Sequence, residues 1–333
     1  MKHNIVVDYI RGVAIILIVT CHFLIFGGVR GWEPLGQWLA GIGNFLFFAL
    51  SALLFGLQYN EKGSAYFLPL AFFKKRFMRL FPALWIFLLI WITIQIFVFK
   101  VYLDPLKIIL NFLGFCWFAK LPDIGHLWFV TMIILCYIMI CGFANKKMKF
   151  KIGGWIILLI ISLFLELGLD SLGKPGYIFV ILFYSLFFFA KASKIIRYAA
   201  AESLARILLM LVLSNGLALI LSFHSDFLFA KSFLKFANCL AGFSWLVLML
   251  RIGEKFRYYK SLDMMLLLVS SYSYELYLVH HIFCCGKLLV INFTECVLLN
   301  YGLLWICAIC TAILIKILGD KIYKRLNVIL YEI

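Results

Sequence analysis

The chain has 333 residues, of which 65% are hydrophobic and 14% charged, and its formal net charge is +16. An ordinary soluble domain has an apolar share of about half, so the composition excludes that class and favours a membrane protein. Windows of about 20 apolar residues recur along the sequence, and a helix of that length crosses about 30 Å of hydrocarbon. Because lipid offers no partner to an unpaired backbone group, each span is predicted to be helical.

Ten spans are predicted in chain order. They lie near residues 5–27, 35–58, 77–99, 126–144, 153–169, 176–190, 203–222, 233–250, 264–284 and 296–318. The fifth and sixth are short and are joined by Leu172-Gly173-Lys174-Pro175-Gly176, and the weakly apolar stretch Asp104–Phe118 is interpreted as an interfacial or re-entrant helix. We therefore expect an all-α polytopic membrane helix bundle with about ten transmembrane helices, forming one domain over residues 1–333 with no fused soluble domain.

Basic residues predict the orientation of the bundle. With a cytoplasmic N-terminus, eight of the 31 lysines and arginines fall in outward segments: Arg30, Lys100, Lys107, Lys120, Lys174, Lys231, Lys235 and Lys287. The other 23 (31 − 8) lie in inward loops and the adjoining helix ends. This excess predicts that both termini are cytoplasmic. It also accounts for the net charge, together with attraction to an anionic inner leaflet, so no nucleic-acid partner is expected.

The first span carries three ionisable residues. A charge at the centre of the bilayer costs about 2.5–3.5 kcal/mol on insertion scales, so such residues are candidates for function. Asp8 and Arg11 stand at i, i+3 and can pair on one helix face, and a purely structural ion pair is the alternative interpretation. His22 follows Arg11 by eleven residues, close to three whole turns, and points to the same side.

A second group lies at the inner entrance of the third span. Arg76 and Arg79 are again at i, i+3, preceded by Lys75 and followed by Pro82. The planar fork of arginine suits phosphate oxygens, and the N-terminus of a helix favours anions. Basic residues beside a span are also ordinary orientation signals, but that interpretation does not predict two arginines on one face.

The fourth and ninth spans carry the remaining polar groups. His126 and Trp128 open the fourth span, and Trp128 is also the kind of residue that anchors a helix at the membrane interface. Residues 270–281 are too polar for a lipid-facing helix. Ser273, Tyr277 and His280 (or His281 in place of His280) fall at i, i+4 and i+7 on one inward-facing stripe.

Depth along the spans separates these residues into two levels. His22, His126 and His280 are predicted in the outer half of the membrane, and the arginines near its inner face. A phosphate-binding entrance inside and imidazoles further out would suit a transmembrane group-transfer enzyme. Most cysteines fall inside apolar spans, where cysteine acts as a small hydrophobe. No spacing indicates a metal site, and only the pair Cys284-Cys285 leaves a redox role open.

Four motifs in chain order resemble the acyltransferase-3 family of integral-membrane acyltransferases. They are Asp8-x-x-Arg11 with His22, Lys75-Arg76-x-x-Arg79-x-x-Pro82, His126-Leu127-Trp128-Phe129, and Ser273-Tyr274-x-x-Tyr277-Leu278-x-His280. The resemblance implies a ten-span enzyme of the bacterial cytoplasmic membrane. Such an enzyme takes an acyl group, commonly acetyl from acetyl-CoA, to hydroxyls of cell-surface glycans or their lipid-linked precursors.

The resemblance also implies roles for matching positions. His22 is implied as general base or as the group that orients the acyl thioester, and Arg11, Asp8 and His280 complete the catalytic set. The phosphates of acetyl-CoA, the co-substrate, are assigned to Arg76, Arg79 and Lys75. The glycan or lipid-linked sugar acceptor is assigned to His126, Trp128, Tyr277 and Ser273. Membrane lipid is the remaining expected partner, and no metal is expected.

The sequence departs from the family at two places. Ala52 follows Ser51 where members often have glycine, and Thr131-Met132-Ile133 offers no glutamate where many members carry one after the tryptophan. Roles of that glutamate therefore do not transfer to this chain. Two alternatives stay open: a transporter or flippase of lipid-linked sugars, although no internal repeat of the transporter kind is visible, and a polytopic partner protein without activity.

Overall fold

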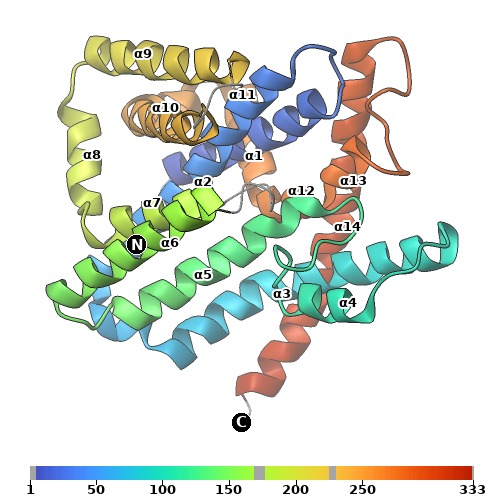
Figure 1. Ribbon diagram of the computed structural model, residues 1–333, viewed down its shortest axis with the longest axis horizontal. Coiled ribbons are helices and arrows are strands. Elements are labelled where there is room, and N and C mark those ends of the chain that lie inside the picture. The colour runs from blue at the N-terminus through green and yellow to red at the C-terminus, as the bar shows by residue number, and fades with distance from the viewer. Residues whose placement is uncertain (1–4, 169–176, 225–229, 332–333) are drawn as a thin grey trace. The chain divides into compact units, whose positions relative to one another are not determined.

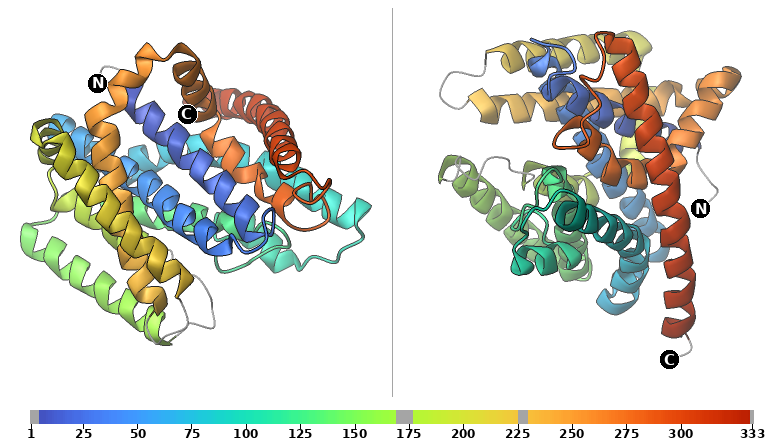
Figure 2. Two further views of the ribbon diagram at one scale, coloured as in Figure 1. Left: turned by 90° about the horizontal axis from the view of Figure 1, so that it is seen from above. Right: turned by 90° about the vertical axis from the view of Figure 1, so that its right-hand side faces the viewer.

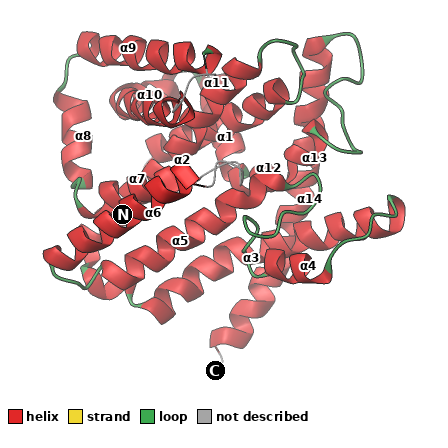
Figure 3. Ribbon diagram, in the orientation of Figure 1, coloured by secondary structure: helices red, strands yellow, loops and turns green. Residues whose placement is uncertain are grey.

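A computed structural model describes residues 5–168, 177–224 and 230–331, and all regular structure in these ranges is helical (Figures 1 and 3). The α-helices are α1 (Ile5–Ile25), α2 (Glu33–Lys62), α3 (Pro69–Thr93), α4 (Pro105–Phe112), α5 (Trp128–Phe143), α6 (Met148–Gly168), α7 (Tyr177–Phe188), α8 (Ala192–Ala201), α9 (Leu204–Phe223), α10 (Ala230–Ile252), α11 (Lys260–Ser271), α12 (Ser273–Val279), α13 (His281–Cys284) and α14 (Val297–Tyr331). The all-α prediction is confirmed.

Seven of the described helical segments are long and apolar enough to cross a membrane. They are Ile5–Ile25, Glu33–Lys62, Pro69–Val98, Gly125–Phe143, Leu204–Phe223, Phe233–Ile252 and Val297–Val328. Two bent helix pairs, α7 with α8 and α11 with α12 and α13, raise the number to nine if each pair is one span. The expected fifth span corresponds to α6, and the predicted linker 172–176 lies outside the described residues. The polytopic architecture is thus confirmed, whereas ten spans and cytoplasmic termini stay predictions.

The ninth predicted span is interrupted. Helix α11 ends at Ser271, and Tyr272 has non-helical dihedrals (φ −111°, ψ 10°) before α12 begins at Ser273. The hydroxyl of Ser271 donates to the carbonyl of Leu268 at 2.8 Å. Serine side chains that bond to the local backbone compete with helical hydrogen bonds, which explains why the serine-rich run breaks the helix.

Two other boundaries differ from the hydropathy pattern. Helix α3 begins at Pro69 rather than near residue 77, because proline is well suited to the first helical turn. The stretch expected as a helix over 104–118 forms only α4, where the carboxylate of Asp104 caps the helix by accepting from the Leu106 N–H at 2.9 Å. The rest of that stretch is loop.

The described contacts divide the chain into two compact units, and each is described by itself. Unit 1 comprises Met1–Ala65 and Gly142–Ser273, and unit 2 comprises Tyr66–Cys141 and Tyr274–Ile333.

In unit 1, α1 packs along α2, and α2 also packs against α7 and α10 (Figure 2). Small residues allow the close approach of α1 and α2: a Cβ on Gly36 would lie 2.7 Å from the Ile25 side chain, and one on Gly43 would lie 2.9 Å from Ile18. Helices α9 and α10 lie side by side (Figure 1) and are joined by a hydrogen bond of 3.0 Å from Ser214 to Ser244.

In unit 2, α3 packs against the long helix α14, which is red in Figure 2. Gly319 of α14 lies against Ala83 of α3. Two tryptophans of α3 fix the last residue of α4 and the loop that follows it. The indole of Trp85 donates to the carbonyl of Phe112 at 2.8 Å, and that of Trp91 donates to Pro122 at 3.1 Å. These bonds give both backbone carbonyls a hydrogen-bond donor, which lipid does not offer.

The contact between α1 and α11 predicts a stability effect. A Cβ on Gly12 would lie 2.7 Å from the backbone oxygen of Leu266, so Gly12→Ala forces the two helices apart. We expect the free energy of unfolding to fall by about 1–3 kcal/mol, the usual cost of overpacking. The fall should appear as a lower thermal unfolding midpoint in detergent.

Gly142→Ala is the matched control, because Gly142 is also helical but has open space around it. Alanine there should leave the midpoint unchanged or raise it slightly, since glycine in a helix is less favourable than alanine. Equal midpoints for the two variants would contradict the packing argument.

Candidate functional site

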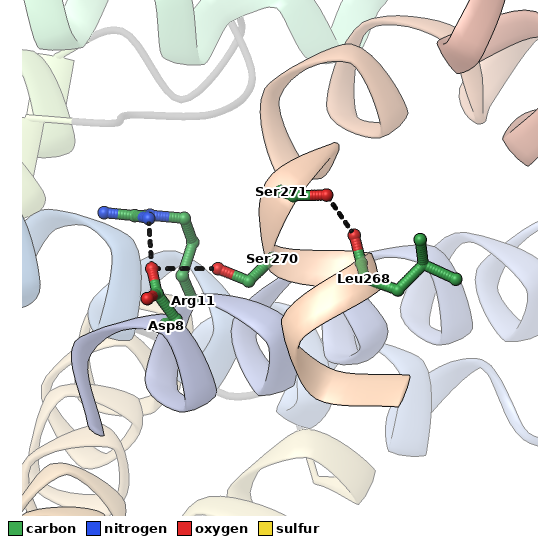
Figure 4. A network of polar contacts seen from close by, with 5 residues as sticks. All are labelled: Asp8, Arg11, Leu268, Ser270 and Ser271. Atoms are coloured by element: carbon green, nitrogen blue, oxygen red, sulfur yellow. Dashed lines mark hydrogen bonds and ion pairs between the residues drawn. The ribbon is translucent and has the colours of Figure 1, made fainter. Parts of the chain in front are cut away.

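The ion pair of the first helix is formed in unit 1. The guanidinium of Arg11 lies 2.9 Å from Oδ1 of Asp8, and the two side chains are 24% and 15% exposed. The hydroxyl of Ser270, on α11, donates to the same oxygen at 3.4 Å (Figure 4). The pairing agrees with the i, i+3 spacing. A carboxylate in the first turn of a helix is also favoured by the helix dipole.

Neighbouring contacts hold this ion pair in place. Tyr9 is fully buried and its hydroxyl donates to Asp263 of α11 at 2.5 Å. With Gly12 against Leu266 and Asp8 bonded to Ser270, α1 therefore touches α11 at three successive levels. The sequence did not predict the Tyr9–Asp263 contact, because 254 residues separate the partners.

His22 lies three turns beyond Arg11 on α1 and is partly exposed. Its Nδ1 is 3.0 Å from the carbonyl oxygen of Ile18. A carbonyl can only accept, so Nδ1 carries the proton in this bond and Nε2 has the lone pair. Phe26 stacks on the imidazole at 6.0 Å between ring centroids. The ring is thus held in a tautomer that can accept a proton at Nε2.

The two arginines of α3 lie in unit 2. The Arg76 guanidinium lies 5.3 Å from the centroid of the Phe72 ring, and the exposed Arg79 follows one turn later. The i, i+3 spacing places both on one side of α3. Lys75 points elsewhere on the same helix, with its ammonium 5.2 Å from the centroid of the Tyr66 ring.

Helix α12 joins this arginine motif. The hydroxyl of Tyr274 donates to the carbonyl of Leu80 at 3.0 Å, between the second arginine and the proline of the motif. The next residue, Glu275, interacts electrostatically with Arg79 and with Lys316 of α14. The arginine motif and the Ser-Tyr motif, 194 residues apart, therefore meet in unit 2.

Three histidines form a buried cluster in the same unit. His126, His280 and His281 are 3%, 0% and 7% exposed. The rings of His126 and His281 stack with centroids 4.5 Å apart, and His280 lies 5.1 Å from His126. His126 and His280, expected only at a similar depth, are thus in ring contact, and His281 belongs to the same cluster.

Backbone carbonyls orient all three rings. Nε2 of His126 lies 3.1 Å from the Leu278 oxygen, Nδ1 of His280 lies 2.9 Å from that of Leu276, and Nδ1 of His281 lies 2.6 Å from that of Asp123. Each of these nitrogens must carry a proton, because the carbonyl only accepts. The hydroxyl of Tyr277 donates to the backbone oxygen of His126, so the His-Leu-Trp-Phe motif is bonded to the Ser-Tyr motif as well.

Asp123 is a residue of this site that the sequence did not predict. Its φ of +62° is rare outside glycine, and such strain persists only where the surroundings fix it. Gln95, 1% exposed on the π-helical end of the third span, donates to the Asp123 carboxylate at 3.1 Å. Gly286 packs directly against that carboxylate. A buried glutamine within an apolar span was the available signal.

Other predicted residues have different surroundings. Trp128 begins α5 and its ring lies 6.2 Å from Phe129, whose ring is 5.1 Å from Tyr277. Ser273 is buried and is the last residue of unit 1, so it is described apart from Tyr277 and His280. At the position of the absent glutamate, Thr131 donates to Gly114 at 2.8 Å and stabilises the loop before α5.

Cys285 is expected to be unreactive. Its sulfur lies 3.1 Å from Nδ1 of His281, but that nitrogen already donates to Asp123 and cannot take the thiol proton. Burial, and secondarily the charge of Asp123, raises the pKa of the Cys285 thiol to about 12. The group is therefore a thiol, not a thiolate, at pH 8, and we expect slow maleimide labelling by mass spectrometry.

Cys296, which is exposed, is the internal comparison and should react faster. Labelling of Cys285 at the rate of Cys296 would contradict this description and would restore the redox interpretation of the Cys284-Cys285 pair.

Comparison with known proteins gives one match. The sequence model of an acyltransferase-3 family, described as an acyltransferase domain, matches residues 4–319. The matched range runs from α1 into α14 and contains all four motifs. Neither the curated proteins nor the solved structures with which the chain was compared give a match.

Proposed function

Because the chain belongs to the acyltransferase-3 family, we propose that it moves acetyl from acetyl-CoA to a hydroxyl of a cell-surface polysaccharide or of its lipid-linked precursor. The observation that supports this best is the bonding of three motifs in unit 2. Tyr274 bonds to the arginine motif, and Tyr277 and Leu278 bond to His126. Motifs far apart in sequence thus build one polar region in a protein whose helices suit a membrane.

Arg76 and Arg79 are the proposed binding groups for the phosphates of the donor, and Lys75, whose ammonium lies over the Tyr66 ring, is proposed to add positive charge beside them. Guanidinium groups form two parallel hydrogen bonds to phosphate, and the i, i+3 spacing places both arginines on one side of α3. Both arginines lie in the first half of the span Pro69–Val98, and the end at which this span begins is proposed to face the cytoplasm, where the donor is. We place the protein in the bacterial cytoplasmic membrane with both termini in the cytoplasm.

His22 is the proposed general base. Nε2 accepts the proton of the acceptor hydroxyl while the hydroxyl oxygen attacks the thioester carbonyl carbon. The new C–O ester bond forms, the C–S bond breaks, and coenzyme A leaves as a thiolate that is then protonated. Arg11, held by Asp8 on the same side of α1, lies about 16 Å along the helix from His22. Its proposed role is therefore to attract the negatively charged donor, and not to contact the reacting atoms.

The buried imidazoles are proposed to bind the acceptor. His126 and His280, with Tyr277 and Trp128, offer aromatic faces and polar nitrogens of the kind that hold a sugar ring. Ser273 is retained in this set as a hydroxyl donor from the start of α12.

The test uses purified protein in nanodiscs with radiolabelled acetyl-CoA and an envelope glycan fraction. We expect label in the glycan, released by mild base as an ester requires. Bound coenzyme without transfer to any glycan would contradict the acceptor class. Glycan movement across vesicles without modification would favour the flippase interpretation.

A further inference from the structure

Lys151 is a buried cation outside all four motifs. It lies in the first turns of α6 and is 8% exposed. Its ammonium is 3.4 Å from the hydroxyl oxygen of Tyr59, near the end of α2, and 5.3 Å from the centroid of that ring. The ring of Phe188, at the end of α7, lies on another side with its centroid at 5.0 Å. We call Tyr59, Lys151 and Phe188 the lysine cage.

The charge in the lysine cage has no counter-ion in the part of the chain that the structure describes. No carboxylate there contacts Lys151, whose neighbours are two ring faces and a phenol. The Tyr59 hydroxyl donates to the carbonyl of Ala144 at 3.1 Å, so its oxygen can only accept from the ammonium. Aromatic faces attract a cation but leave its charge in place. Lysine is almost never buried without a paired charge, which indicates an anion from outside the chain.

The surroundings are rich in positive charge. Exposed lysines flank the cage on the loop before α6 and at the start of α8: Lys146, Lys147, Lys191 and Lys194. The first-turn N–H groups of α6 and the positive end of its dipole add to this field, as at any helix N-terminus. Such a setting favours a phosphate group, which accepts several hydrogen bonds.

Exposed apolar side chains on α6 indicate the source of that phosphate. Phe150, Ile152 and Ile156 are 53%, 45% and 45% exposed, directly beside the buried lysine. Hydropathy predicts α6 as the fifth span, and in a span these side chains would meet acyl chains. Basic pockets between membrane helices at the cytoplasmic side bind anionic lipid headgroups. A lipid uses both features, whereas a water-soluble anion uses only the charges.

We propose that the lysine cage binds the phosphate of an anionic phospholipid headgroup. The ammonium of Lys151 donates to the phosphate oxygens, and the acyl chains lie along the apolar face of α6. The site is independent of acyl transfer, and its test measures binding and not activity.

The experiment compares the full chain with K151M and with K149M, which removes an exposed lysine two residues away. Each protein is titrated in detergent with phosphatidylglycerol or phosphatidylcholine. Lipid binding is counted by native mass spectrometry, and the unfolding midpoint is followed in parallel. Wild type and K149M should bind phosphatidylglycerol about fivefold tighter than K151M does. Phosphatidylcholine should not distinguish the three proteins.

The midpoints separate binding from a structural role. Methionine keeps the length of the lysine stem and removes the buried charge, so K151M should keep its midpoint in phosphatidylcholine and lose the gain from phosphatidylglycerol. A fall of the same size in both lipids would show a structural role and overturn the proposal. A Lys151-dependent gain from coenzyme A or inorganic phosphate, with none from phosphatidylglycerol, would overturn it as well.

Discussion

The variant His22→Ala is expected to lose acyl transfer by about 10²–10⁴-fold, the usual contribution of a general base. The loss should appear in kcat, because the imidazole accepts a proton only as the hydroxyl attacks. Binding of acetyl-CoA should be unchanged, since phosphates are assigned to other residues. Initial rates of glycan labelling measure the first quantity, and equilibrium binding of labelled coenzyme measures the second.

His224→Ala is the matched control for His22. His224 ends α9, is exposed, and its Nδ1 lies 3.0 Å from the oxygen of Ile220, the same local bond that His22 makes to Ile18. The control removes an equivalent imidazole and an equivalent backbone bond, so it should keep full activity. Activity retained in His22→Ala, with normal membrane insertion, would remove His22 from the mechanism.

The variants Arg76→Ala and Arg79→Ala are expected to raise the KM for acetyl-CoA by about 10- to 100-fold each. The reason is the loss of charge-assisted hydrogen bonds to phosphate, each about 1.5–3 kcal/mol. Lysine at either position should restore only part of the affinity, because an ammonium cannot make the two parallel bonds of a guanidinium. Titration of binding with labelled coenzyme checks both results.

Arg206→Ala tests whether the loss of any surface arginine has the same effect. Arg206 is exposed and pairs with Glu202 at 3.0 Å, far in sequence from the motif. The variant Arg206→Ala should leave the KM for acetyl-CoA unchanged. A reduction of kcat alone in the Arg76 and Arg79 variants would mean that these arginines act on the reaction and not on donor binding.

The class of the protein was predictable because bilayer physics leaves only helices for apolar runs of this length. The pairing of Asp8 with Arg11 was predictable for a similar reason: it depends only on helical spacing. The break at Tyr272 was not predicted, because hydropathy averages over a window and does not register serine side chains that bond to the backbone.

The histidine cluster was predictable only in part. Depth along the spans predicts His126 and His280 at a similar level of the membrane, but it does not predict that their rings are in contact. The contact depends on the loop that ends at Asp123, and a positive φ at an aspartate leaves little trace in a single sequence. Tyr274 was visible as a motif residue, whereas its bond to Leu80 depends on how α3 and α12 pack.

Unit 1 has a consequence for folding during synthesis. Its two pieces are separated along the chain by residues 66–141, so Tyr9 meets Asp263 only after most of the protein has left the ribosome. Helix α1 must therefore lie in the bilayer before α11 has been synthesised. The ion pair of Asp8 and Arg11 needs no distant partner, because both residues lie on one turn. The pair cancels the net charge of α1 as soon as the helix forms. The helix can therefore enter the bilayer early, and its packing against α11 can follow late in synthesis.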